Sequence, residues 1–104
     1  MYIRLSKIMK KDYFRKILDE AIIQAKHEFD SYPDIKLNES ILLQLVDIKK
    51  QVVENGVRFS EDEAYERYSL GILALRNFGG EDENDYPKKL SDIAWGISYY
   101  PSMA

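Results

Sequence analysis

The chain has 104 residues, no cysteine, one histidine and a formal net charge of −3, which suits a single domain over residues 1–104 with a modest core of its own. Its apolar content of 45% and charged content of 32% are typical of a folded globular protein, and the lack of cysteine excludes disulfides and thiolate metal sites. No apolar run approaches the roughly 18 residues of a membrane span, and the basic N-terminus lacks the apolar core and cleavage site of a signal peptide, so we expect a cytoplasmic protein with no membrane partner.

The first predicted helix covers residues 11–31, because its apolar residues recur at three- and four-residue spacing. They are Phe14, Leu18, Ala21, Ile22, Ala25 and Phe29. Tyr32 precedes Pro33, and a residue before proline is disfavoured in the α region, so the helix should end there. Residues 1–10 are predicted either as an extra turn of helix or as an extended arm.

A second helix is predicted over residues 38–54, with Asn38 as its N-cap. Its apolar stripe consists of Ile41, Leu45, Ile48 and Val52, widened by Leu42, Val46 and Val53. The pair Asn55-Gly56 is a stop signal, because both residue types tolerate the left-handed conformation that follows many helices.

A third helix is predicted over residues 60–78, where Ser60 and Glu63 have the spacing of a capping box. Its second half is apolar in every direction, through Leu70, Ile72, Leu73, Ala74 and Leu75. A helix that is apolar all round is buried all round, so we expect this half to be the central rod of the fold. Gly79-Gly80 is the predicted end of the helix.

A fourth helix is predicted to begin at Asp85 or Tyr86, with Pro87 in its first turn, where the missing N–H costs nothing, and to close at Pro101. Its inner face consists of Leu90, Ile93, Ala94 and Ile97. The predicted fold class is therefore all-α, a compact antiparallel bundle of four main helices with the third helix central.

Two glycines lie inside predicted helices, Gly71 in the third and Gly96 in the fourth. A glycine inside a helix costs roughly 1 kcal/mol relative to alanine. A helix that accepts this cost often needs a close approach of another backbone, so we expect the two helices to pack closely where these glycines meet. The alternative is that both glycines are merely tolerated.

No pattern in the sequence indicates catalysis, a cofactor or a metal. The one histidine, His27, lies between charged residues and is predicted to be on the surface. The chain has no nucleophile elbow, no phosphate-binding glycine loop and no dinucleotide fingerprint. The acidic run at residues 81–86 lacks the glycine and the bidentate glutamate of a calcium loop.

Charge is distributed unevenly, because residues 58–104 contain five Lys/Arg against nine Asp/Glu, a balance of −4. Acidic clusters occur at residues 61–63 and 81–85. Such a surface disfavours nucleic acid and favours a basic partner. The alternative is that each cluster is a solvated helix start or a solvated loop.

Aromatic residues are abundant, and five of them are hard to bury together in so small a bundle: Tyr65, Tyr86, Trp95, Tyr99 and Tyr100. By contrast, Phe14, Phe29, Tyr68 and Phe78 lie on predicted inner faces. Aromatic rings beside acids are typical of a protein-binding surface. They can equally cap the ends of a core with the hydroxyl in water.

Three segments occur in an order that resembles a known family. They are a first helix that ends in "YP", the apolar "YSLGILALRNF" of residues 68–78, and "LSDIAWGI" of residues 90–97 after an acidic stretch. The chain resembles, over roughly residues 11–98, the small helical immunity proteins of interbacterial type VI secretion systems. The similarity is greatest to those that neutralise effectors with an NAD(P)+-glycohydrolase toxin domain, and immunity proteins against nucleotide pyrophosphokinase toxins have a similar build.

The resemblance implies a protein that binds a cognate toxin domain in the cytoplasm, with an expected stoichiometry of one-to-one, occludes its active site and catalyses no reaction. An acidic face would mimic the charge of a phosphate-bearing substrate. Charge and aromatic clustering give the predicted toxin-binding face: Glu61, Asp62, Tyr65, Glu66, Glu81, Asp82, Glu83, Asp85 and Tyr86. Two other functions stay open, a helical adaptor, chaperone or regulator, and a small enzyme or ligand-binding bundle.

Overall fold

The structure is a computed structural model that describes residues 2–73 and 85–104. Every regular element in these residues is helical, which confirms the all-α prediction. The elements are η1 (Leu5–Lys7), α1 (Lys11–Ser31), α2 (Lys36–Ile48), η2 (Lys49–Glu54), α3 (Glu61–Arg67), α5 (Asp85–Gly96) and η3 (Tyr100–Ser102), and residues 70–73 are also helical. The predictions for Ala74, Leu75, Phe78, Gly79-Gly80 and the acidic residues 81–83 lie outside the described residues.

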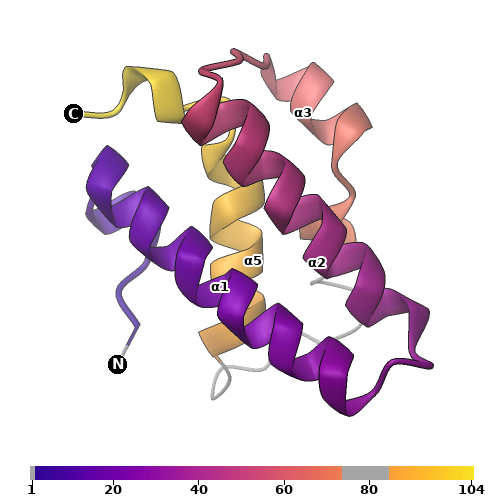
Figure 1. Cartoon of the computed structure of the whole chain (residues 1–104). Coiled ribbons are helices and arrows are strands. Elements are labelled where there is room, and N and C mark those ends of the chain that lie inside the picture. Colours follow the sequence, from indigo (N-terminus) through magenta and orange to yellow (C-terminus); the bar gives the residue numbers. More distant parts are fainter. Residues whose placement is uncertain (1, 74–84) are drawn as a thin grey trace.

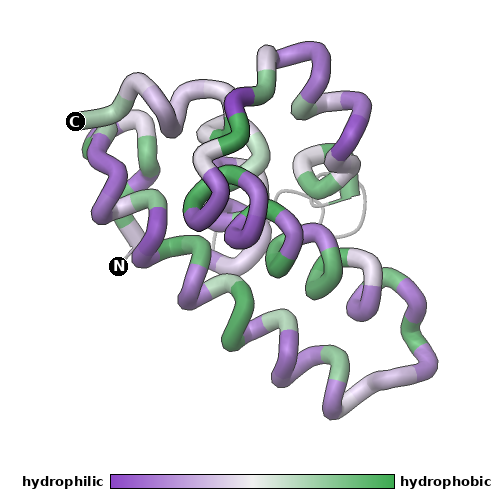
Figure 2. Tube along the Cα trace, turned by 45° about the horizontal axis from the view of Figure 1, so that its top comes forward, coloured by the Kyte–Doolittle hydropathy of each residue, from purple (hydrophilic) through white to green (hydrophobic). Residues whose placement is uncertain are grey.

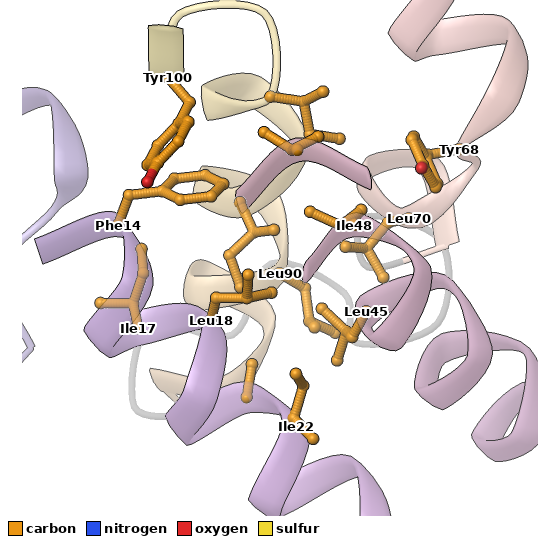
Figure 3. Close-up of a cluster of buried hydrophobic side chains, with 14 of the residues drawn as sticks. Phe14, Ile17, Leu18, Ile22, Leu45, Ile48, Tyr68, Leu70, Leu90 and Tyr100 are labelled. Carbon is orange, nitrogen blue, oxygen red and sulfur yellow. The ribbon is translucent and has the colours of Figure 1, made fainter. Parts of the chain in front are cut away.

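Helices α1 and α2 run antiparallel, and α5 crosses behind them, so that the three enclose most of the core (Figure 1). Hydrophobic and hydrophilic positions recur along α1 and α2 with a helical period (Figure 2). Most of the fully buried side chains come from these three helices, several of which are labelled in Figure 3, and the others come from the arm before α1, from η2, from residues 70–73 and from the turn after α5. They are Leu5, Phe14, Ile17, Leu18, Ile41, Leu45, Ile48, Val52, Leu70, Leu90, Ile93 and Ile97.

The helical hairpin follows its local signals closely. Helix α1 has the predicted bounds and ends before Tyr32. Helix α2 begins at Lys36, two residues earlier than predicted, and Asn38 is not its N-cap. The Asn38 amide instead donates hydrogen bonds to the carbonyls of Glu28 and Tyr32, each at 3.2 Å, and so ties the turn together.

The second helical stretch continues from α2 into the π-helical η2 and ends at Glu54, as predicted. Gly56 follows in the left-handed region, with φ +67°, which confirms the stop signal. Val46 was expected to widen the buried stripe, but it is 45% exposed. Phe29 is also only half-buried.

The prediction of one helix over residues 60–78 is wrong at Tyr68, where α3 ends in extended backbone (φ −123°, ψ 118°). The extended backbone lets the Tyr68 ring turn inward, where it is 5% exposed, and its hydroxyl donates to Asp47 of α2 at 2.6 Å. Gln44 of α2 donates to the Ser69 hydroxyl at 3.0 Å. The helix resumes at Leu70, which is fully buried, whereas α3 itself buries only Ala64.

The two interior glycines do not meet. A Cβ built on Gly71 would lie 3.3 Å from the Ala94 Cβ, so residues 70–73 do pack closely on α5, but through an alanine. A Cβ on Gly96 would lie 2.8 Å from carbons of Leu5 and Phe14, so Gly96 makes room for the N-terminal arm and α1. Helix α5 ends at this glycine, earlier than the predicted end at Pro101.

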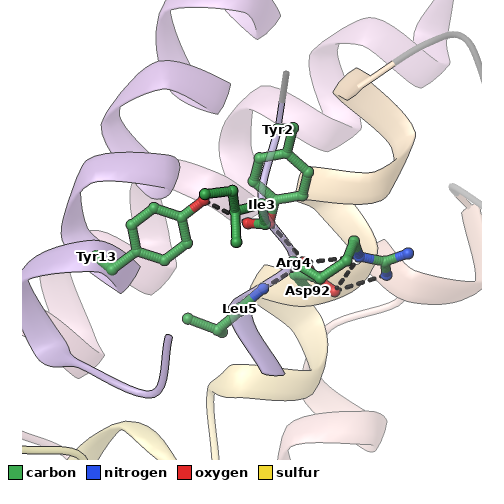
Figure 4. Close-up of polar contacts among 6 residues, drawn as sticks. All are labelled: Tyr2, Ile3, Arg4, Leu5, Tyr13 and Asp92. Atoms are coloured by element: carbon green, nitrogen blue, oxygen red, sulfur yellow. Dashed lines mark hydrogen bonds and ion pairs between the residues drawn. The ribbon is translucent and has the colours of Figure 1, made fainter. Parts of the chain in front are cut away.

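The N-terminal arm is extended on either side of the single turn η1, so it combines both predicted alternatives. It is held by Asp92 of α5, a carboxylate that is 7% exposed (Figure 4). Asp92 accepts hydrogen bonds from the Tyr2 hydroxyl at 2.5 Å, from the Arg4 guanidinium at 2.7 to 3.2 Å and from the Leu5 backbone N–H at 3.0 Å. We call this contact between residues 2–5 and Asp92 the clasp.

Burial alone would raise the pKa of the Asp92 carboxyl. The hydrogen bonds from Arg4, Tyr2 and Leu5, with the positive charge of Arg4, more than offset this effect, so the pKa lies below its ordinary value. The carboxylate therefore stays ionised within the clasp at neutral pH.

Candidate interaction groove

A groove of about 390 Å³ separates α3 from α5. One wall comes from α3 and the residue after it, and the other from α5 and the turn that follows it. The lining residues are Glu61, Ala64, Tyr65, Tyr68, Gly71, Ile72, Ser91, Ala94, Trp95, Ser98 and Tyr99.

The groove has an apolar floor, because α5 and residues 70–73 turn small side chains toward each other. Ala94 faces Gly71, and a Cβ at position 71 would lie 3.3 Å from the Ala94 Cβ, so the two elements approach closely here. On α5 the lining positions 91, 94 and 95 follow helical spacing, so they share one face, and Ser98 lies in the turn after the helix. The groove therefore exists because this face of α5 carries serine and alanine around a single large residue, Trp95.

Two aromatic side chains at the groove are far more exposed to solvent than the residues of the core. Trp95 is 43% exposed and Tyr65 is 67% exposed. The Trp95 ring lies against Tyr99, with centroids 4.7 Å apart and planes inclined by 38°. Large exposed rings around an apolar hollow are typical of a protein-binding site.

The acidic side chain of the groove is Glu61, which accepts a hydrogen bond from the Tyr99 hydroxyl at 2.5 Å. This bond spans the groove and raises the pKa of Tyr99, because the nearby carboxylate disfavours a phenolate. Asp62 and Glu66 are exposed on the same helix. None of the eleven lining residues is a lysine or an arginine.

Helix α3 is held in place at both ends. At its start, the Ser60 side chain accepts from the Glu63 N–H, and the Glu63 carboxylate accepts from the Ser60 N–H, which confirms the predicted capping box. At its end, Arg67 and Tyr68 both donate to Asp47 of α2.

The contacts at the end of α3 shift the pKa values of Tyr68 and Asp47. Burial and the Asp47 carboxylate raise the pKa of Tyr68 to about 12. The hydrogen bonds from Tyr68 and Arg67 lower the pKa of Asp47. At neutral pH, Asp47 is therefore an ionised carboxylate that accepts hydrogen bonds from the neutral Tyr68 hydroxyl and from the Arg67 guanidinium. These bonds fix the α3 wall of the groove relative to α2.

The structure brings together only part of the predicted toxin-binding face. Glu61 and Tyr65 line the groove, whereas Asp62 and Glu66 are exposed on α3 but do not line it. Glu81, Asp82 and Glu83 lie outside the described residues.

Asp85 and Tyr86 line a different hollow of about 460 Å³, whose other lining residues are Glu20, Gln24, Glu28, Asn38 and Lys89. Burial raises the pKa of Tyr86 to about 12. Asp85 begins α5 and Tyr99 follows its end, and a 12-residue helix is about 18 Å long. The start of α5 is therefore remote from Glu61.

Nine of the eleven groove residues were not in the predicted candidate site, and the two aromatic residues of the α5 side among them are Trp95 and Tyr99. Both were recognised as aromatic residues that are hard to bury, and they stand four residues apart beside the small residues Ser91, Ala94 and Ser98. That pattern of large and small residues on one helical face was the available signal. It did not reveal that α3 forms the opposite wall.

Comparison with protein families matches residues 13–98 to the Tsi6 family. The chain belongs to this family. The Tsi6 family consists of type VI secretion immunity proteins, so the chain is an immunity protein with a cognate toxin as its implied partner. No curated protein and no solved structure matches the chain.

The Tsi6 match covers ten of the eleven groove residues, all except Tyr99, and also Asp92, but not the arm residues of the clasp. In the part of the chain that the structure describes, no group of three or more His, Asp or Glu side chains is placed to hold a metal ion. Across the same residues, no helix is long and apolar enough to span a bilayer.

Proposed function

We propose that this Tsi6-family protein binds a cognate interbacterial toxin domain one-to-one in the cytoplasm, occludes the toxin's active site and catalyses no reaction itself. The toxin is proposed to consume NAD(P)+ or to use another nucleotide. The observation that carries the proposal is the family match over residues 13–98, and the aromatic groove between α3 and α5 supplies a surface of the required kind.

The acidic character of α3 supports a toxin of this class. A domain that binds a dinucleotide or nucleotide needs cationic side chains for the phosphates, and these remain exposed around an empty active site. Glu61, Asp62 and Glu66 are exposed acidic residues of α3, and residues 58–104, which include α3, have a charge balance of −4. Opposite charges would speed association and set the orientation of the complex.

The composition of the groove argues against a catalytic role. Its polar lining side chains are one carboxylate, two serines, three tyrosines and one tryptophan. It includes neither histidine nor lysine to act as a general base. His27 lies on the exposed side of α1, outside the groove lining. Binding is thus the chemistry that these side chains support.

Co-expression tests the proposal. The candidate toxin domain, sought in the gene immediately upstream, would be induced with and without the immunity protein, and growth and cellular NAD(P)+ would be followed. We expect rescue of growth, preserved NAD(P)+ and a one-to-one complex on a sizing column. Continued killing despite soluble immunity protein would reject the immunity function, and rescue from a toxin that leaves NAD(P)+ and other nucleotides unchanged would reject the toxin class.

A further inference from the structure

We propose that the groove between α3 and α5 receives a segment of the toxin in which an arginine or lysine stands beside an apolar side chain. This inference rests on the proposed function, since it assigns the surface and the chemistry of the partner. It concerns Glu61, Tyr65, Trp95 and Tyr99, together with the small residues of the floor.

The floor of the groove fits an apolar side chain. Ala64, Ile72 and Ala94 line it without any charged group, and Gly71 adds no side chain to it. At about 390 Å³ the hollow is large enough for one or two side chains rather than for a whole helix. Burying an apolar group here would remove exposed aromatic surface from water, which favours binding.

The rim of the groove fits a cation. Within residues 2–73 and 85–104, Glu61 takes part in no ion pair, and its hydrogen-bond partner is the neutral hydroxyl of Tyr99. A carboxylate with a neutral donor keeps its full negative charge. A cation from the toxin would therefore find an uncompensated partner at this point, which is the charge complementarity that selects the occupant.

The aromatic rings favour the same occupant. Trp95 and Tyr65 expose ring surface at the groove, and the face of an indole or phenol ring attracts a cation. A guanidinium can stack on a ring while it donates two hydrogen bonds to a carboxylate, so arginine satisfies both groups at once. Lysine would satisfy the charge but not the planar stacking.

The chain contains one tryptophan, which makes a direct test possible. Immunity protein labelled with 5-fluorotryptophan gives a single ¹⁹F signal, from Trp95, and unlabelled toxin domain is added while complex formation is followed on a sizing column. We expect the signal to shift as the complex forms. A complex that leaves the Trp95 signal unchanged would overturn the groove assignment and leave the immunity function intact.

Charge is tested with Glu61→Gln against the matched control Glu39→Gln, an exposed glutamate on α2. Glu61→Gln should weaken toxin binding at least tenfold at low salt and make the affinity less sensitive to salt, whereas the control should change neither. Circular dichroism and thermal melting confirm that both variants fold. Equal affinity for both variants would exclude a cation at Glu61.

The occupant is identified by cross-linking. Tyr65 is replaced by the photoreactive p-benzoylphenylalanine, with the exposed Leu43 of α2 replaced in the same way as the control. We expect cross-links from position 65 to a toxin segment that contains an arginine or lysine next to an apolar residue. Cross-links to a segment without a basic residue would overturn the proposal, as would equal cross-linking from position 43. Absence of any complex with wild-type protein would instead reject the proposed function.

Discussion

The two sides of α5 differ in how completely they are filled. On one side, Gly96 leaves room for Leu5, and Asp92 accepts hydrogen bonds from three residues of the arm. The arm therefore fills this side of α5, and the Asp92 charge is paired with Arg4. On the other side, Trp95 is 43% exposed beside a groove of about 390 Å³, and the Glu61 carboxylate that faces it has a tyrosine as its partner. A side that is closed in this way contributes stability, whereas the open side with large rings is the one that we propose for binding.

This difference predicts where substitutions separate folding from function. Changes in the clasp should lower the free energy of unfolding. They should reduce toxin binding only because a smaller fraction of the protein is folded. Changes in the groove should reduce toxin binding with little change in stability.

Leu5→Ala should have the largest effect. Leu5 is fully buried against Gly96, and truncation of a buried leucine costs about 2–5 kcal/mol. Urea unfolding at pH 7 measures the loss. Ile3→Ala in the same arm is the control, because Ile3 is 48% exposed and should cost under about 0.5 kcal/mol. Equal losses for the two variants would mean that the arm does not seat Leu5 in the core.

Asp92→Asn should destabilise the protein by about 2 kcal/mol at pH 7, because the charged acceptor of the hydrogen bonds from Tyr2, Arg4 and Leu5 is lost. The Arg4 side chain is 47% exposed, which keeps the loss below that of a fully buried ion pair. Asp12→Asn is the control, since Asp12 pairs with Arg15 on the surface.

The same variant has a pH signature. The pKa of Asp92 is lowered in the folded protein, so its stabilisation is complete above the ordinary aspartate pKa of about 3.9 and is lost as the pH falls through the folded value. The stability difference between wild type and Asp92→Asn should therefore shrink in acid. A difference that is constant between pH 7 and pH 3 would show that the ionised carboxylate is not what holds the clasp.

Gly96→Ala and Gly71→Ala compare the two sides of α5 directly. The new methyl group at position 96 would lie 2.8 Å from Leu5 and Phe14, and such overpacking costs about 1–3 kcal/mol. At position 71 the methyl group would lie 3.3 Å from Ala94, at the open side, where a small shift and the better helix propensity of alanine offset the contact. Thermal unfolding should show a clear loss only for Gly96→Ala.

How much of this fold can be predicted from the sequence depends on how local its causes are. The bounds of α1 follow from a period of apolar residues and from Pro33, and the start of α3 follows from Ser60 and Glu63. The break at Tyr68 is caused by Asp47, a residue 21 positions away, and no local pattern indicates it. The arm is held by Asp92, about 90 positions away, so the sequence left its conformation open.

The candidate site shows the same limit. Glu61 and Tyr65 were predicted because acidic and aromatic residues cluster there in the sequence. The acidic residues before α5 form a similar cluster, but Asp85 lies at the opposite end of α5 from the groove. Trp95 was recognised as a residue that is hard to bury, yet its place in the groove depends on the packing of α3 against α5, which the sequence does not specify.

Tyr65→Ala should have the smallest effect on stability and a large effect on function. Tyr65 is 67% exposed, so its loss should change the free energy of unfolding by under about 0.5 kcal/mol. As an anchor at the centre of a binding surface, however, it should weaken toxin binding by about tenfold or more, or at least about 1.4 kcal/mol. Calorimetric titration with the toxin domain measures the affinity, with Tyr32→Ala as the control, because Tyr32 is 59% exposed at the far end of α1. If the two variants bind equally well, the open side of α5 is not where the toxin is held, and the contrast between its two sides is one of packing alone.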